Sequence, residues 1–213
     1  MRRLRILKLV LFPAALAPLA LLLWKGVHDG LGANPIEVIT HATGDWTLRL
    51  ILVTLSITPL RRITRQYWLI GVRRMIGLFA FFYGTLHFLT YIWLDKFFDF
   101  HEMFKDIAKR PFITVGFSAF VLMIPLALTS TAWSIRRLGG KNWQRLHRLI
   151  YVTAILGVVH YLWLVKADRR KPLEYGAVLS VLLLYRVGAW LTTKRQKETV
   201  SVSAQSRGEF TKV

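Results

Sequence analysis

The sequence predicts an all-α integral membrane protein, a six-transmembrane-helix bundle whose N and C termini both lie in the cytoplasm. Three observations support this fold class. The 213 residues are 54% hydrophobic without counting glycine, whereas soluble proteins average about 45–50% with glycine included. Six apolar segments reach or approach the length that crosses a bilayer. The basic residues alternate between the connecting loops in the order that six spans require.

The apolar segments cover approximately residues 6–24, 45–60, 75–94, 112–128, 149–165 and 173–191. A transmembrane helix needs roughly 17–25 predominantly apolar residues. The first segment follows several basic residues, as the apolar part of a signal peptide does. It is too long for that part, contains Pro13 and Pro18, and lacks a following cleavage site, so we expect it to remain as a span.

The second segment is the shortest, and it carries Arg49. It reaches bilayer length only if its hydroxyl side chains bond to backbone carbonyl groups of the same helix, which removes their cost in an apolar environment. We expect such bonds from Thr47, Thr54, Ser56 and Thr58.

The distribution of charge predicts the orientation of the bundle. The N-terminal segment, the 61–74 and 136–148 loops and the end of the chain contain 20 basic and two acidic residues, and the other side contains 10 and nine. Because basic residues accumulate in cytoplasmic loops, we expect a multi-pass protein of the bacterial inner membrane with its basic side inward. This topology explains the net charge of +19, so we expect contact with the lipid bilayer and none with nucleic acid.

Only the 166–171 loop departs from this rule, because it is basic and yet lies on the predicted external side. The loops are too short to hold a second folded unit. We therefore expect residues 1–191 to form one six-helix domain. Residues 192–213 form a polar cytoplasmic tail, which its composition predicts to be disordered.

The absence of cysteine restricts the chemistry of the chain. It excludes disulfides, thiolate-ligated haem, cysteine-ligated iron–sulfur clusters and covalent c-type haem, which needs C-x-x-C-H. A redox cofactor would have to be held by histidine or without covalent bonds.

Two histidines lie deep in predicted spans, at matched depth. His87 is about 12 residues into the third span and His160 about 11 into the fifth, and both spans run outward. Neither span contains an acid that could pair with them. Ionisable residues inside a membrane are costly and indicate function, and two imidazoles can serve as the axial ligands of one haem iron. The pattern favours haem ligation and one-electron transfer over hydrogen bonding between helices.

A third histidine, His147, lies at the cytoplasmic end of the fifth span, and its role stays open. It is 13 residues, or about 20 Å of helix, before His160, which would suit a second haem. However, Arg73, Arg74 or Met75 occupies the partner position on the third span. His147 could equally be solvated or bind an anionic head group or a flavin phosphate. The remaining histidines, His28, His41 and His101, fall in predicted external loops.

Three arginines are candidate contacts of a cofactor. Arg49 lies near the expected depth of the haem, where it could pair with a propionate or instead extend to the membrane surface. Arg73 and Arg74 are first of all determinants of topology. Contacts with phosphate or propionate are their second possible role.

Several motifs, spread over nearly the whole chain, resemble one family. The most specific is Trp143-x-x-Leu146-His147-Arg148-Leu149-x-Tyr151, which continues to His160-x-x-Trp163. The others are Thr43-Gly44-Asp45-Trp46, Thr58-Pro59-Leu60-Arg61-Arg62, Arg73-Arg74-Met75-Ile76-Gly77-Leu78, Leu86-His87-Phe88 and Ala127-Leu128-Thr129-Ser130. In these motifs the chain resembles the MsrQ family, haem-binding membrane subunits of the bacterial periplasmic methionine sulfoxide reductase system, within the ferric-reductase-like transmembrane superfamily.

The resemblance implies an electron-transfer subunit of an oxidoreductase complex that binds haem b, with FMN also described in the family. It implies that the chain takes electrons from the quinone pool or a cytosolic flavin reductase. It implies that the chain passes them to a periplasmic molybdopterin-containing methionine sulfoxide reductase subunit. By motif position His87, His147 and His160 are the candidate haem ligands. Wider relatives carry two histidines on the third helix, where this chain has only His87.

Two alternatives use the same sequence features differently. One is a stand-alone transmembrane ferric or quinol oxidoreductase, although the short external loops leave little room for a self-contained substrate site. The other is a non-redox transporter or scaffold. Transport usually uses broken helices and acidic groups, and only Pro13, Pro18 and Pro125 suggest breaks.

Overall fold

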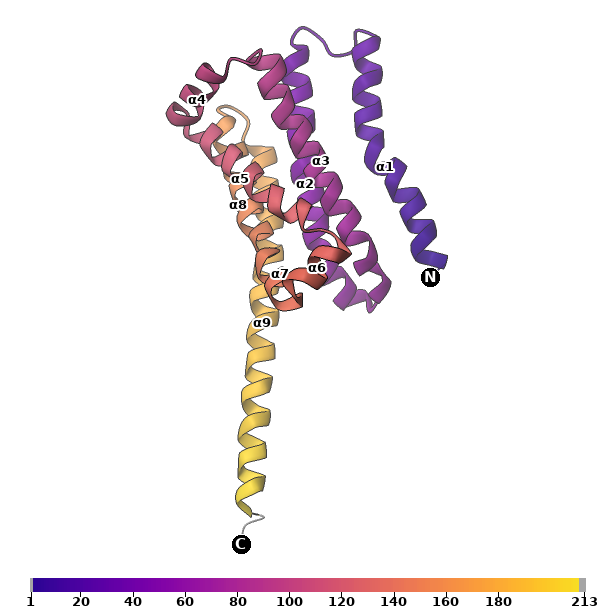
Figure 1. Ribbon diagram of the computed structural model, residues 1–213, viewed down its shortest axis with the longest axis vertical. Helices are drawn as coiled ribbons and strands as arrows, with labels where there is room; N and C mark the ends of the chain where they lie inside the picture. Colours follow the sequence, from indigo (N-terminus) through magenta and orange to yellow (C-terminus); the bar gives the residue numbers. More distant parts are fainter. Residues whose placement is uncertain (1, 211–213) are drawn as a thin grey trace.

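The computed structural model describes residues 2–210, with side chains over 4–194 and at Gln196. Every regular element in this range is helical, which confirms the predicted all-α class (Figure 1). In chain order the elements are α1 (Arg2–Val27), α2 (Pro35–Thr64), η1 (Tyr67–Leu69), α3 (Ile70–Thr90), η2 (Tyr91–Asp95), α4 (Phe100–Lys109), α5 (Pro111–Leu128), α6 (Ala132–Leu138), α7 (Gly140–Leu146), α8 (Leu149–Leu164) and α9 (Arg170–Phe210).

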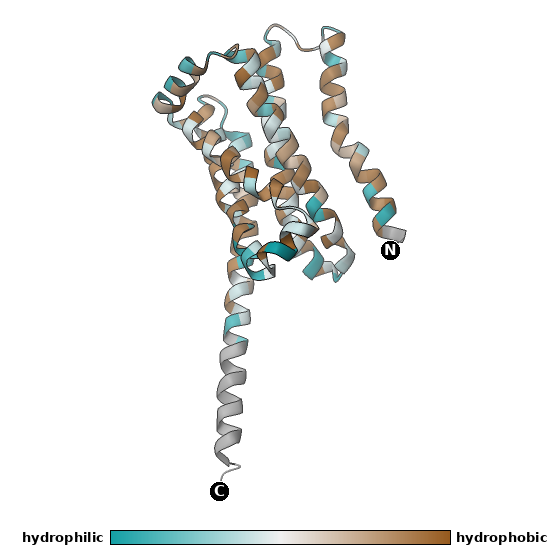
Figure 2. Cartoon of the chain, in the orientation of Figure 1, coloured by the Kyte–Doolittle hydropathy of each residue, from teal (hydrophilic) through white to brown (hydrophobic). Residues whose placement is uncertain are grey.

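Among the described residues, five helical segments are long and apolar enough to cross a membrane: Leu4–Val27, Tyr67–Asp95, Pro111–Leu128, Gly140–Leu164 and Arg170–Lys194. They correspond to five of the six predicted spans. Hydrophobic residues dominate α1, α5 and α8, and hydrophilic residues gather toward the two ends of the bundle (Figure 2). This pattern suits a bundle surrounded by lipid. The sixth span, which would be α2, and the cytoplasmic position of both termini stay predictions.

The bundle packs around α2, which contacts α1, α3, α8 and α9. Leu55 in its middle is completely buried, and Ile51 is only 2% exposed. The helix starts ten residues before the predicted span. The Asn34 side chain accepts a hydrogen bond from the backbone N–H of Glu37 at 3.4 Å, and Pro35 occupies the first turn, where it needs no donor.

The hydroxyl groups of α2 largely bond as the sequence predicts. Thr47, Thr54 and Ser56 each donate to a backbone carbonyl oxygen three or four residues earlier, at 2.7–2.8 Å. The hydroxyl of Thr58 is buried and has no hydrogen-bond partner among the described residues. Three of the four expected bonds therefore remove a polar group from the apolar interior.

Three short helices, α4, α6 and α7, lie in segments that the sequence predicts as loops. Of the three, α4 has the most stabilising contacts. The side chain of Asp99, its N-cap residue, accepts a hydrogen bond from the backbone N–H of Glu102 at 3.0 Å. The buried carboxylate of Asp106 pairs with Lys96 at 2.5 Å and with Arg110 at 3.3 Å. These ion pairs fasten α4 to the end of η2 and to the start of α5.

The start of α1 lies at the same end of the bundle as α6 and α7, and α9 continues past that end (Figure 1). This agrees with termini on one side of a membrane. α9 extends to Phe210, so it includes much of the segment 192–213 that the sequence predicts to be disordered. The last three residues lie outside the described part of the chain.

Candidate haem site

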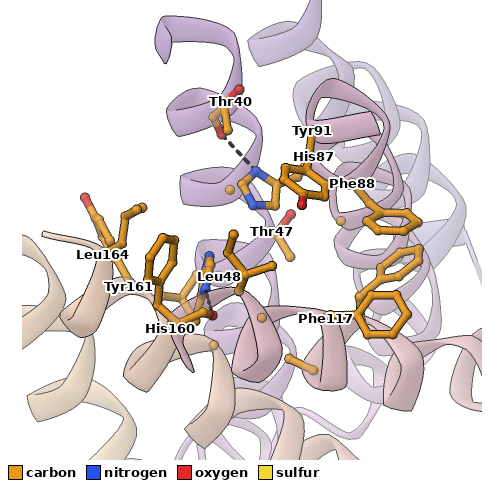
Figure 3. A pocket seen from close by; sticks show the side chains of 18 of the residues that line it. Thr40, Thr47, Leu48, His87, Phe88, Tyr91, Phe117, His160, Tyr161 and Leu164 are labelled. Atoms are coloured by element: carbon orange, nitrogen blue, oxygen red, sulfur yellow. Dashed lines mark hydrogen bonds between the residues drawn. The ribbon is translucent and has the colours of Figure 1, made fainter. Parts of the chain in front are cut away.

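A cavity of about 550 Å³ opens between α2, α3, α5 and α8, toward the end of the bundle that carries α4. This volume is within the range of cofactor and ligand pockets. Both deep histidines line it, His87 from α3 and His160 from α8 (Figure 3). The structure thus brings together the two residues that the sequence pairs by depth.

The ring of His87 is held by one nitrogen. Its Nδ1 lies 2.9 Å from the backbone carbonyl oxygen of Thr40 on α2 (Figure 3). A carbonyl oxygen only accepts, so Nδ1 carries the proton and Nε2 keeps its lone pair. Gly44, one turn further along α2, makes room for the ring, because a Cβ there would lie 3.1 Å from Cε1 of His87.

His160 is held in the same way by a different helix. Its Nδ1 donates to the backbone carbonyl oxygen of Phe112 at the start of α5, at 2.7 Å. A Cβ at Gly116 would lie only 2.6 Å from that Nδ1, closer than real Cβ atoms approach. Glycine at this position is therefore a condition for the observed position of the imidazole.

The spacing of the two rings fits one metal centre. Their centroids are 6.1 Å apart, and their planes are inclined by 74°. Two imidazoles that bind one metal from opposite sides, each through one nitrogen at about 2 Å, have ring centres roughly 6 Å apart. Metal-ligating histidines also typically donate their other N–H to a carbonyl group, as both do here. The described residues contain no group of three or more His, Cys, Asp or Glu that could hold a metal ion. The chemistry of the pair would suit a haem, whose porphyrin would bring further nitrogen ligands of its own.

The cavity wall combines an apolar body with a polar mouth. Phe88 stacks on Phe120 with 4.8 Å between centroids, and both line the cavity. Two buried hydroxyl groups in the wall, those of Tyr91 and Thr153, have no hydrogen-bond partner among the described residues. Buried polar groups normally have partners, so these two hydroxyls suit a bound group that carries polar substituents. The side chains with a formal charge among those that line the cavity are Glu37, Asp45, Asp95 and Arg110.

His147 lies elsewhere. It caps the end of α7, before α8 begins, and is not among the residues that line the cavity. Its ring stacks on Trp143 with 3.8 Å between centroids. Nδ1 lies 3.1 Å from the carbonyl oxygen of Trp143, and Nε2 lies 3.5 Å from the Ser130 hydroxyl. Both ring nitrogens thus have neighbours in the protein.

The guanidinium of Arg49 is occupied by protein partners. It pairs with Asp45 at 3.0 Å, donates to the Tyr175 hydroxyl at 2.8 Å, and lies over the Trp46 ring. Arg49 does not line the cavity, although Asp45 does. A direct contact between Arg49 and a propionate would therefore have to replace or share these bonds.

The arginines of the opposite end are also separate from the cavity. Arg73 is partly buried and lies close enough to Arg186 and Arg61 for electrostatic interaction, whereas Arg74 is exposed. Arg186 itself donates to the Tyr151 hydroxyl at 2.5 Å and to a backbone carbonyl on α2 at 2.9 Å. His147, Arg73 and Arg74 remain candidates for a second, cytoplasmic-side site.

Several residues of the site have little signal in the sequence. The carbonyl groups of Thr40 and Phe112 act through the backbone, so no side chain marks them. Tyr91 opens η2, a π-helical turn directly after α3, and such turns are frequent at functional sites. The expectation that His41 lies in an external loop is wrong, because α2 begins at Pro35 and carries His41 to the mouth of the cavity.

Comparison with known proteins places the chain among described relatives. Residues 43–158 match the family described as ferric reductase like transmembrane component. The chain is 57% identical over 197 residues to the protein-methionine-sulfoxide reductase heme-binding subunit MsrQ of Herminiimonas arsenicoxydans, covering 92% of this chain and 90% of the relative. Proteins of the same name from Bordetella pertussis and Caulobacter vibrioides are 54% and 53% identical, over 86% and 82% of this chain and 90% and 83% of the relatives.

Proposed function

The chain belongs to the MsrQ family of heme-binding subunits of protein-methionine-sulfoxide reductase, and on that premise we propose that it is the b-type cytochrome subunit of such a system. It carries electrons from the quinone pool or a cytosolic flavin reductase across the bacterial inner membrane. The acceptor is a periplasmic molybdopterin-containing methionine sulfoxide reductase subunit, which repairs oxidised periplasmic proteins. The chain is thus the electron-transfer subunit, and the reduction of the sulfoxide takes place on its partner.

The observation that supports this function best is the His87–His160 pair. The two rings face one cavity with centroids 6.1 Å apart, and each is held at Nδ1 by a backbone carbonyl. His87 and His160 would hold a haem there, and a haem held by two histidines would supply one-electron transfer.

The protein residues hold, orient and shield the cofactor. The carbonyl groups of Thr40 and Phe112 hold both rings in the tautomer whose Nε2 is available. The apolar wall around Phe88 and Phe120 would shield a bound cofactor from water on that side, which limits side reactions. The free hydroxyls of Tyr91 and Thr153 can donate to polar groups on the cofactor.

The opposite end of the bundle is where electrons enter in this proposal. Six spans, with α2 as the sixth, place His147, Arg73 and Arg74 at the cytoplasmic face. There they serve a second cytoplasmic-side cofactor or donor, which is a haem, a flavin such as FMN, or a quinone. Guanidinium groups suit the phosphate of a flavin nucleotide or a carboxylate.

The test is a dithionite-reduced minus oxidised absorption spectrum of the purified protein, with haem quantified per chain. We expect a low-spin six-coordinate spectrum in the wild type. It should be lost in His87→Ala and His160→Ala, with haem content falling by more than about tenfold because each variant removes an axial ligand. His101→Ala is the matched control, because His101 is an exposed histidine on α4 and does not line the cavity. A colourless wild type from haem-replete cells contradicts the proposal.

A further inference from the structure

The connection between α8 and α9 presents a cluster of exposed basic side chains, Lys166, Arg169, Arg170 and Lys171, here called the basic rim. In the part of the chain that the structure describes, no carboxylate lies within 4.0 Å of any of the four side chains. Asp168, within the same loop, accepts from the backbone N–H of Arg170 at 3.1 Å and so caps the helix. The four cations of the rim therefore form no ion pair among the described residues, and the charge of residues 166–174 stays net positive after Asp168 and Glu174 are counted.

Some of the other basic residues at this end of the bundle are paired, whereas Lys25 and Lys109 form no ion pair with a described carboxylate. Lys96 and Arg110 share Asp106, at 2.5 and 3.3 Å. Lys105 pairs with Glu102 at 2.9 Å. The rim differs from the rest of this end because four such cations fall within six consecutive residues.

Membrane insertion does not account for these charges. Basic residues beside a span favour the cytoplasmic side, and the rim lies at the end that carries α4, opposite α6 and α7 (Figure 1). Basic segments that bind anionic lipid are typically cytoplasmic too. A role in recognition outside the membrane is the explanation that remains.

The rim also borders the haem site. His160, Tyr161 and Leu164 line the cavity from the last turns of α8. The helix ends at Leu164, and Lys166 follows two residues later. Trp163, next to Leu164, is 54% exposed. A protein that contacts the rim is thereby brought close to the cofactor cavity.

We propose that the basic rim is the docking surface for an acidic surface patch on the soluble protein that accepts electrons from this chain. The inference rests on the proposed outward electron transfer. Redox partners typically form small, short-lived interfaces, and opposite charges on the two surfaces raise their association rate. The four cations of the rim, which follow the cavity-lining end of α8, provide that attraction.

The test uses the full-length, haem-loaded protein in nanodiscs of phosphatidylcholine, which has no net charge. The probe is the soluble periplasmic methionine sulfoxide reductase subunit, fluorescently labelled for a binding titration. In parallel, stopped-flow absorbance follows the reoxidation of the reduced haem. The variant is Lys166→Glu/Arg169→Glu, and Lys166→Gln/Arg169→Gln gives the intermediate case. The matched control is Arg136→Glu/Arg137→Glu, an exposed basic pair on α6 at the opposite end.

We expect the charge reversal to lower the association rate constant by at least about tenfold and to reduce its dependence on salt, with the neutral variant between. The control should stay within about twofold of the wild type. Haem content and spectrum should match the wild type in all variants, which shows that they fold. Equal rates and affinities for wild type and charge reversal overturn the proposal. An effect that appears only in nanodiscs with anionic phosphatidylglycerol overturns it in favour of lipid binding.

The binding titration and the reoxidation of the haem together distinguish failure of the proposed function from failure of the docking surface. If the subunit binds through the rim but never reoxidises the haem, the docking surface stands and the outward electron transfer is wrong. If the haem is reoxidised equally by all variants, the electron transfer stands and the docking surface is wrong.

Discussion

The two ends of the bundle both present histidines, but the rings are held differently. At the end that carries α4, His87 and His160 each bond to a backbone carbonyl through Nδ1 and turn the rest of the ring to a shared cavity. At the other end, His147 stacks on Trp143 and has a neighbour at each nitrogen. The two ends therefore differ in whether the histidine rings face a shared cavity and a second histidine. On this difference rests our expectation that His87 and His160, rather than His147, hold the haem.

The largest expected effect separates the two ends directly. His160→Ala should abolish the low-spin haem spectrum, with a loss of more than about tenfold in haem per chain. His147→Ala should leave the spectrum of the His87–His160 pair unchanged, since His147 does not line that cavity. Haem quantification and electron paramagnetic resonance on both variants measure this. Loss of the bis-histidine signal in His147→Ala would remove the distinction between the two ends.

The next effect tests whether the position of the ring, and not only its presence, matters. Gly116→Ala introduces a Cβ 2.6 Å from Nδ1 of His160, so the ring must leave its bond to the Phe112 carbonyl. We expect haem affinity to fall by about 10–100-fold, as for other losses of ligand support. Gly44→Ala places its Cβ at 3.1 Å from His87, so a smaller loss is expected.

Haem titration of the apoprotein ranks these variants. Gly188→Ala on α9 is the control, because nothing lies within 4 Å of the position of its Cβ. An affinity of Gly116→Ala equal to that of the control would show that the ring tolerates displacement. The tight contacts would then have no bearing on ligation.

Part of this site could be predicted from the sequence. The pairing of His87 and His160 follows from hydropathy and helix geometry, because both set the depth of a residue along a span. The hydroxyl bonds of α2 follow from the cost of polar groups in an apolar environment, and three of the four are present.

Other features depend on contacts that no local pattern encodes. The guanidinium of Arg49 donates a hydrogen bond to the hydroxyl of Tyr175, which lies 126 residues away in the sequence. The carbonyl partners of the two histidines lie 47 and 48 residues from them. α4 is a helix because Asp99 caps it and Asp106 binds neighbouring cations, although its sequence is polar enough to resemble a loop. The sequence therefore predicts which residues are deep, and the tertiary structure decides which of those are free to bind a ligand.

The smallest expected effect concerns α4, whose C-terminal end borders the cavity. Ile107 and Arg110, at the end of α4 and beyond it, line the cavity, and the carboxylate of Asp106 holds α4 in place through Lys96 and Arg110. Asp106→Asn should therefore speed the transfer of haem to excess apomyoglobin by roughly fivefold, for a pair worth about 1 kcal/mol. Glu102→Gln is the control, because it removes only the exposed pair with Lys105.

The pH dependence of this effect identifies the cation involved. The hydrogen bond to Asp106 raises the pKa of Lys96 above its ordinary value. A raised pKa in the folded state means that the stabilisation is complete below the ordinary pKa of about 10.4 and is lost as the pH rises through the raised value. The difference in haem transfer between wild type and Asp106→Asn should accordingly be constant from neutral pH to about pH 10 and shrink above it. It should not vanish, because Arg110 stays charged and keeps its contact with Asp106. A difference that is already absent at neutral pH would show that α4 does not control access to the His87–His160 cavity.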